Sequence, residues 1–90
     1  MIETIVCTFE ISNTFEEWVE KFDHVEAPAR HDKGIRVLFR GVSKQSPNQV
    51  VVIVQAEVGV VSQHIQDNLA FFSKNGAVMQ TAVPMAYWVH

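Results

Sequence analysis

The stretch from residue 35 to residue 58, IRVLFRGVSKQSPNQVVVIVQAEV, decides the fold because it predicts a β-hairpin. Apolar residues alternate with other residues over Ile35 to Val42, and Val50 to Val58 is apolar on both faces in its first half. A period of two residues is the pattern of a strand. The polar segment between them, Ser43 to Asn48, contains a proline and is typical of a turn. We therefore expect two antiparallel strands in the middle of the chain.

On the N-terminal side of this hairpin, the sequence predicts a strand followed by a helix. Ile2 to Ile11 alternates, and Thr14 with Glu17 three residues later forms a capping box that begins a helix. One helix stripe is formed by Phe15, Trp18, Val19 and Phe22. We expect Pro28 to end or kink this helix, and the polar residues Arg30 to Gly34 to form a loop.

On the C-terminal side, the sequence predicts a second helix and a last strand. The helix spans Val61 to Lys74 and stops at Asn75-Gly76. Its apolar stripe contains Val61, Ile65, Leu69 and Phe72. The strand covers Met85 to Val89. The resulting order, β-α-β-β-α-β over residues 1–90, predicts one ferredoxin-like α+β domain. Its antiparallel sheet has the order 4-1-3-2, and both helices lie on one face.

Composition excludes several classes of function. Seven Lys and Arg residues against ten Asp and Glu residues give a net charge of -3, which argues against a nucleic-acid partner. Even the longest apolar runs, such as Val50 to Val54, are far shorter than the ~20 residues of a membrane helix. No signal peptide is evident, and the single cysteine, Cys7, forms no internal disulfide. We expect a cytoplasmic protein that binds neither membranes nor nucleic acid.

One face of the predicted sheet lacks a cover. The face expected to contact the helices carries Ile5, Cys7, Phe9, Val37, Phe39, Val52 and Val54. The opposite face carries Val6, Leu38, Val51 and Ile53 together with Thr4, Thr8, Arg36, Arg40, Gln55 and Glu57. Either Tyr87 or Trp88 joins this opposite face, because neighbouring strand residues point to opposite sides. An apolar patch of this kind predicts a homodimer that stacks two sheets. The alternative is a monomer with a few exposed aliphatic residues.

Several segments together resemble the dimeric α+β barrel superfamily. The resemblance depends on Thr14 to Trp18, Phe22-Asp23, Gly34, the valine-rich third strand and Met85 to Trp88. This superfamily includes antibiotic-biosynthesis-type monooxygenases, haem degraders, isomerases and proteins without known activity, and the chain is most similar to an uncharacterised group of small cyanobacterial proteins. The resemblance implies a barrel formed by two chains. It transfers no catalytic residue to this sequence.

Five residues are candidates for ligand binding. Arg36 lies opposite Gln55 or Glu57 in the predicted hairpin, so that Arg36 and Glu57 either fix the register of a dimer or bind a polar ligand. His64, with Asp67 one turn later, is either a general base near an apolar cleft or part of an ordinary helix-surface pair. Tyr87 and Trp88 belong to a set of aromatic residues that either pack a core or stack a flat ligand.

No other side chains predict a catalytic or metal site. His24 and His31 are expected in solvent, the terminal His90 is expected to be mobile, and Cys7 is expected to be a small buried hydrophobe. We therefore predict no metal or cofactor. Two hypotheses remain. One is a homodimeric binding or structural module, with a small hydrophobic ligand as a candidate partner. The other is a cofactor-independent monooxygenase or isomerase that acts on a small hydrophobic or aromatic molecule.

Overall fold

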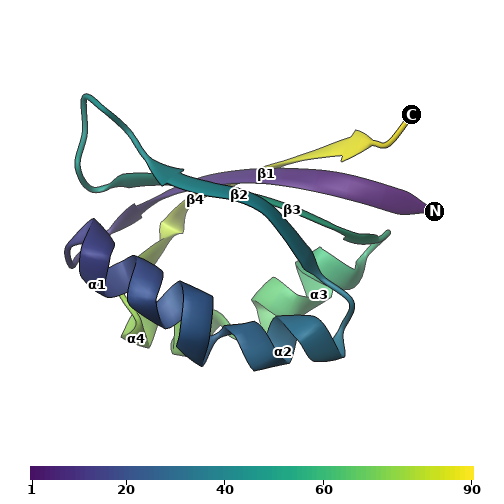
Figure 1. Ribbon diagram of the computed structural model, residues 1–90, viewed down its shortest axis with the longest axis horizontal. Helices are drawn as coiled ribbons and strands as arrows, with labels where there is room; N and C mark the ends of the chain where they lie inside the picture. The colour runs from purple at the N-terminus through teal and green to yellow at the C-terminus, as the bar shows by residue number, and fades with distance from the viewer.

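The computed structural model describes every residue from Met1 to His90. Four strands form one sheet, and all helical segments lie on one side of it (Figure 1). The elements are β1 (Ile2–Ile11), α1 (Phe15–Glu20), the π-helical turn η1 (Lys21–Val25), α2 (Ala27–Asp32), β2 (Arg36–Val42), β3 (Gln49–Glu57), α3 (Val60–Asp67), α4 (Leu69–Lys74) and β4 (Ala77–Trp88). The predicted βαββαβ order is confirmed, and each predicted helix consists of consecutive shorter segments.

The sheet has the predicted topology. Its order is β2-β3-β1-β4, which is 4-1-3-2 read from the other edge, and every neighbouring pair is antiparallel. In the central pair, Ile5 lies opposite Val54 and Cys7 lies opposite Val52. These residues face the helices, as the alternation in the sequence predicts.

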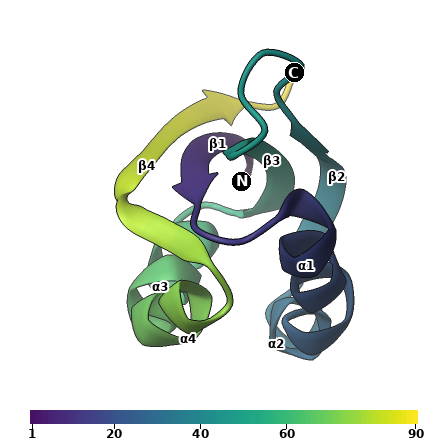
Figure 2. The ribbon, with the colours of Figure 1, turned by 90° about the vertical axis from the view of Figure 1, so that its left-hand side faces the viewer.

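The hydrophobic core fills the space between this face of the sheet and the helices. Trp18 is only 2% exposed. Its ring stacks on Phe22 at 4.9 Å between centroids and meets the ring of Phe9 edge-on at 5.6 Å. The predicted capping box is present, with the Glu17 amide donating to Thr14 Oγ1 and the Thr14 amide donating to the Glu17 carboxylate. Figure 2 shows α1 and α2 beneath the β2 edge of the sheet, and α3 and α4 beneath the β4 edge.

The first helical region extends further than the sequence predicts. The loop predicted from Arg30 to Gly34 is wrong over Arg30 to Asp32, which belong to α2. At the junction the Glu26 amide donates to the Lys21 carbonyl, five residues back, and this bond forms the π-helical turn. Pro28 then lies in the first turn of α2, where its missing N–H leaves no hydrogen bond unmade. The proline therefore marks the start of a new segment after the distortion.

Strand β2 contains a β-bulge at Leu38. Val37 pairs with Val54, whereas Phe39 pairs with Ile53, so Leu38 is an extra residue in this strand. One extra residue moves every later side chain to the other face. The predicted helix-side position of Phe39 is therefore wrong, and Phe39 is 52% exposed on the face away from the helices.

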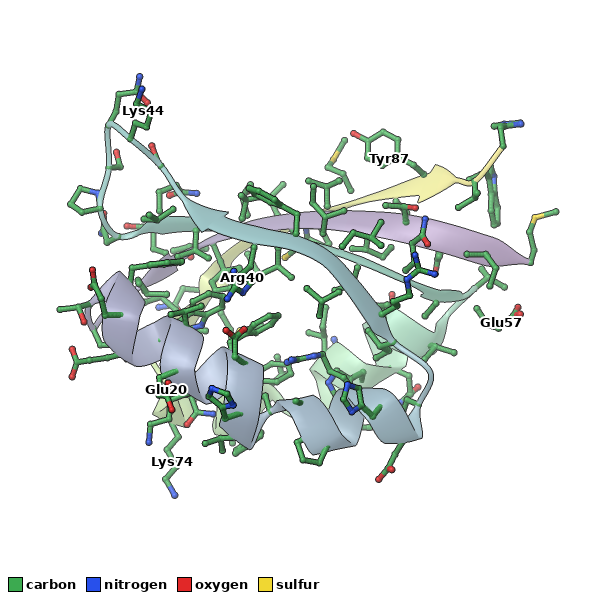
Figure 3. The ribbon with its side chains drawn as sticks, viewed as in Figure 1. Glu20, Arg40, Lys44, Glu57, Lys74 and Tyr87 are labelled. Atoms are coloured by element: carbon green, nitrogen blue, oxygen red, sulfur yellow. The ribbon has the colours of Figure 1, made fainter.

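The same bulge corrects the position of Arg40, which the sequence places on the open face. Arg40 points towards the helices and donates from Nε and Nη2 to the two carboxylate oxygens of Asp23, at 2.9 and 2.6 Å (Figure 3). This guanidinium also lowers the pKa of Asp23. The ion pair thus ties β2 to η1.

The second helical region is broken at Asn68. This residue leaves helical geometry, with φ −126° and ψ 19°, and its Nδ2 donates to the His64 carbonyl at 2.8 Å. Because α4 begins anew after the break, Leu69 is 40% exposed and does not continue the predicted stripe. Val61 is buried, and Ile65 and Phe72 pack against the core as predicted.

Strand β4 is much longer than the predicted Met85 to Val89, because it begins at Ala77 directly after Gly76. Its register against β1 shifts between the pairs Val78–Glu10 and Val83–Thr8. Within this shift Thr81 Oγ1 accepts a hydrogen bond from the Glu10 amide at 2.8 Å, which gives that amide a partner where the strand ladder is interrupted.

The register of β4 also decides which aromatic residue faces away from the helices. Tyr87 pairs with Thr4, and Met85 pairs with Val6, so both share the uncovered face. Trp88 pairs with Glu3 on the other side. In Figure 3 the Tyr87 ring points away from the helical layer. We call this uncovered side the open face. Arg36, Glu10 and Glu57 lie on it at strand ends, and the rest of it is formed by Thr4, Val6, Thr8, Phe39, Gly41, Val51, Ile53, Gln55, Val83, Met85 and Tyr87.

Candidate functional site

A cavity of about 90 Å³ lies between the sheet and the helices. Sixteen residues line it, of which thirteen are hydrophobic, and they come from the central strands, β4 and both helical regions. The other three are Glu26, Arg30 and His64, which are 4%, 7% and 4% exposed. Three buried polar side chains in an otherwise apolar wall need hydrogen-bond partners, because burial without a partner is unfavourable.

Arg30 is held rigidly by Phe22. Its Nη2 donates to the Phe22 carbonyl at 2.8 Å, and its Cζ lies 4.0 Å from the centroid of the Phe22 ring. Its Nη1 is buried and has no hydrogen-bond partner. Burial lowers the pKa of the guanidinium, while the charges of Glu26 and Asp23 oppose that shift without forming an ion pair with it. Arg30 therefore presents a fixed, positively charged donor that is unused.

His64 presents a second unused donor. Asn68 Nδ2 donates to the His64 carbonyl and lies 3.3 Å from His64 Nδ1. The amide nitrogen must face that carbonyl, since two oxygens would repel, so Nδ1 acts as the acceptor and the proton of the neutral ring is on Nε2. His64 Nε2 is buried without a partner. Burial, and then the charges of Lys33 and Arg30, lower the pKa of His64, which favours this neutral form.

Glu26 is the only carboxyl group in the cavity wall. Its Oε2 accepts from Asn75 Nδ2 at 2.8 Å, which links the start of α2 to the end of α4. Burial raises the pKa of Glu26 and favours its neutral form. Burial also raises the pKa of the half-buried Cys7 thiol in the same wall, so Cys7 is a hydrophobic wall residue, in line with its predicted role.

The five candidate residues from the sequence do not come together. Arg36 pairs with Gln55, one of its two predicted neighbours, and forms no ion pair with Glu57 within the chain. Glu57 instead accepts from the amino group of Met1 at 2.8 Å. Tyr87 lies on the open face and Trp88 on the opposite side of β4. Only His64 lines the cavity.

The predicted contact between His64 and Asp67 is also absent. Asp67 accepts from Gln63 Nε2 at 2.8 Å, and its other oxygen lies 3.7 Å from Lys33 Nζ. The His64 ring faces Asn68 instead. A histidine without a carboxylate partner lacks the orienting group that a general base commonly has.

Sequence reasoning missed Arg30 and Glu26 because it placed Arg30 in a solvated loop. Pro28 offered the signal, since proline is favoured in the first turn of a helix and two residues later Arg30 falls within that helix. Taken together, the cavity provides two fixed N–H donors without acceptors, one charged and one neutral, beside an apolar wall. This is an arrangement for binding an acceptor, with no nucleophile paired to a base.

One known protein family matches this sequence. The sequence model of a family described as Domain of unknown function (DUF3764) matches residues 2–90, nearly the full chain. The chain belongs to this family. No curated protein and no solved structure matches it. No helix of this DUF3764 domain has both the length and the apolar character needed to cross a membrane.

Proposed function

We propose that this DUF3764 domain acts as a homodimeric binding module, in which two copies pair their open faces. The observation that carries the proposal is the apolar character of that face. Four of its large side chains are more than half exposed in the single chain: Phe39 at 52%, Val83 at 55%, Met85 at 52% and Tyr87 at 53%. Burying side chains of this size is worth roughly 1.5–3 kcal/mol each when burial is complete. A second copy of the chain is the simplest cover for such a surface.

The size of the open face fits a dimer. Four strands at about 4.8 Å spacing and about 3.3 Å per residue along the nine residues of β3 give a plan area of about 570 Å². The relief of the side chains raises the accessible area above this value. Specific interfaces bury about 800 Å² on each partner, so a dimer of standard size would use the whole face.

The distribution of polar groups supports the same pairing. On this face Gln55 Nε2 donates to Thr4 Oγ1 at 3.0 Å, so these two polar side chains are hydrogen-bonded to each other within the chain. The charged residues Arg36, Glu57 and Glu10 lie at the ends of their strands. A neutral centre with a charged rim is the usual anatomy of an interface. Pairing through this face is also what the resemblance to dimeric α+β barrels implies.

Sedimentation velocity with matched variants tests the pairing. Met85→Lys puts a charge on the open face, whereas Val25→Lys puts the same charge on η1, where Val25 is 49% exposed. We expect wild type and Val25→Lys to sediment at twice the chain mass of 10.2 kDa, and Met85→Lys to sediment as a folded monomer. A wild-type monomer at about 100 μM, far above the Kd of specific interfaces, would exclude the dimer.

The alternative function, a cofactor-independent monooxygenase or isomerase, has less support. An enzyme of that kind needs a substrate cavity of roughly 300 Å³ or more, and the cavity lined by His64 is about 90 Å³. Neither Arg36 nor Tyr87 reaches it. These observations favour the binding module over the enzyme.

A further inference from the structure

The cavity on the helix side of the sheet is separate from the open face, and two of its polar groups lack hydrogen-bond acceptors. Arg30 Nη1 and His64 Nε2 are both buried donors without acceptors. They come from two different helices, α2 and α3, and line one cavity. A buried donor that has lost water and gained no partner is unfavourable. Two such donors in one small cavity indicate that an acceptor belongs between them.

We propose that this cavity binds a small monocarboxylic acid, with its carboxylate on Arg30 Nη1 and His64 Nε2 and its apolar body against the hydrophobic wall. The proposal identifies the ligand of the binding module and rests on that binding role, but it is independent of the pairing of two chains.

The charges around the cavity favour a carboxylate head. Arg30 has no carboxylate within ion-pair distance, whereas the nearby cations Arg40 and Lys33 have Asp23 and Asp67 as partners. The one carboxyl group in the wall, Glu26, is bonded to Asn75 and forms no ion pair with Arg30, and burial raises its pKa, which reduces the negative charge that would repel an anion. A charge-assisted hydrogen bond from arginine to a carboxylate is stronger than one to a neutral oxygen.

The wall of the cavity determines the polarity and the size of the ligand's body. Thirteen of its sixteen residues are hydrophobic, including Trp18 and Phe72, so an apolar chain is preferred over a second polar group. The volume of about 90 Å³ restricts the ligand to a short chain. Phe22 contributes twice, because its carbonyl and its ring hold the guanidinium in place before any ligand arrives.

Titration calorimetry on the wild-type chain tests the head group without any variant. Butyrate and hexanoate are compared with butyramide and hexanamide, which keep the shape of the head and remove its charge. We expect at least one acid to bind, and its amide to bind at least about tenfold more weakly. In NMR spectra the Trp18 indole signal is expected to shift while the Tyr87 signals stay in place. If neither acid binds, or if acid and amide bind equally, the proposal is wrong and the cavity holds only water or a neutral molecule.

Two pairs of variants locate the head group. Arg30→Met is expected to weaken binding at least about tenfold, whereas Lys44→Met, at the hairpin tip, removes a positive charge without effect (Figure 3). His64→Phe is expected to weaken binding, whereas His24→Phe on the exposed side of η1 does not. Equal affinity of Arg30→Met and wild type would overturn the assignment. Sedimentation of the same samples reports the dimer separately, so failure of the ligand proposal and failure of the dimer give different results.

Discussion

Replacing Arg30 with methionine should leave the stability of the folded chain nearly unchanged, although Arg30 is 7% exposed and bonded within the core. The substitution removes a charged hydrogen bond to the Phe22 carbonyl, worth about 1.5–3 kcal/mol. It also exchanges a cation–π contact of about 0.5–2 kcal/mol for a sulfur–aromatic contact of about 0.3–1.5 kcal/mol. Both changes lower the free energy of unfolding.

Loss of the unpaired Arg30 Nη1 raises the free energy of unfolding and opposes these changes. Removing the unpaired Nη1 relieves about 1–3 kcal/mol, and a neutral side chain avoids the burial of a charge, for which an apolar replacement is often neutral or stabilising. The two sides nearly cancel. We expect the free energy of unfolding of Arg30→Met to lie within about 1.5 kcal/mol of wild type.

Urea denaturation followed by circular dichroism measures this difference, with all samples at equal concentration because association would add to apparent stability. Trp18→Ala calibrates the assay, since this 2% exposed ring should cost about 3–5 kcal/mol. A loss of more than about 3 kcal/mol in Arg30→Met would refute the reasoning. It would mean that Arg30 holds α2 in place and is not available for a ligand.

Three further predictions concern other parts of the fold. Gly76→Ala should lower the free energy of unfolding more than Gly34→Ala, because both have positive φ (111° and 70°) but only at Gly76 does a new Cβ meet Asn13; equal losses in urea would count against this. The pKa of folded His64 lies below its ordinary 6.5, so the unfolded chain gains the proton first. Stability should therefore fall as pH drops below about 6.5, less so in His64→Gln, and identical pH profiles would be contrary evidence. Because burial raises the pKa of Cys7, iodoacetamide should modify the folded chain at least about tenfold more slowly than the urea-unfolded chain, and similar rates would disprove the burial.

The sequence predicts the regular parts of this fold well because each has its own local signal. Alternation predicts β1, a short valine-rich run predicts β3, and Thr14 with Glu17 marks the start of α1. These signals suffice for the order of the elements. With four strands and the usual handedness of crossovers they also suffice for the sheet topology.

The irregular parts were beyond prediction for physical reasons. The alternation of apolar residues in β2 gives no sign of the bulge at Leu38. Only the pairing of β2 with β3 decides which residue is the extra one. At the break the Asn68 side chain donates to the His64 carbonyl. An asparagine at this position is also compatible with a continuous helix, so the sequence does not predict the break. Both candidate donors of the cavity adjoin such irregularities, because Arg30 bonds to a carbonyl in η1 and His64 lies one turn before the break. Of the candidate site, sequence reasoning therefore recovered only His64.

The extra residue at Leu38 has a consequence for reading the family. In a relative that lacks this residue, the side chains that correspond to Phe39 to Val42 would point to the opposite faces of the sheet. An alignment without a gap at this position would equate Arg40, which contacts Asp23, with a side chain that points outwards. Insertion or deletion of one residue at this position would thus exchange the side chains of β2 that face the helices with those on the open face.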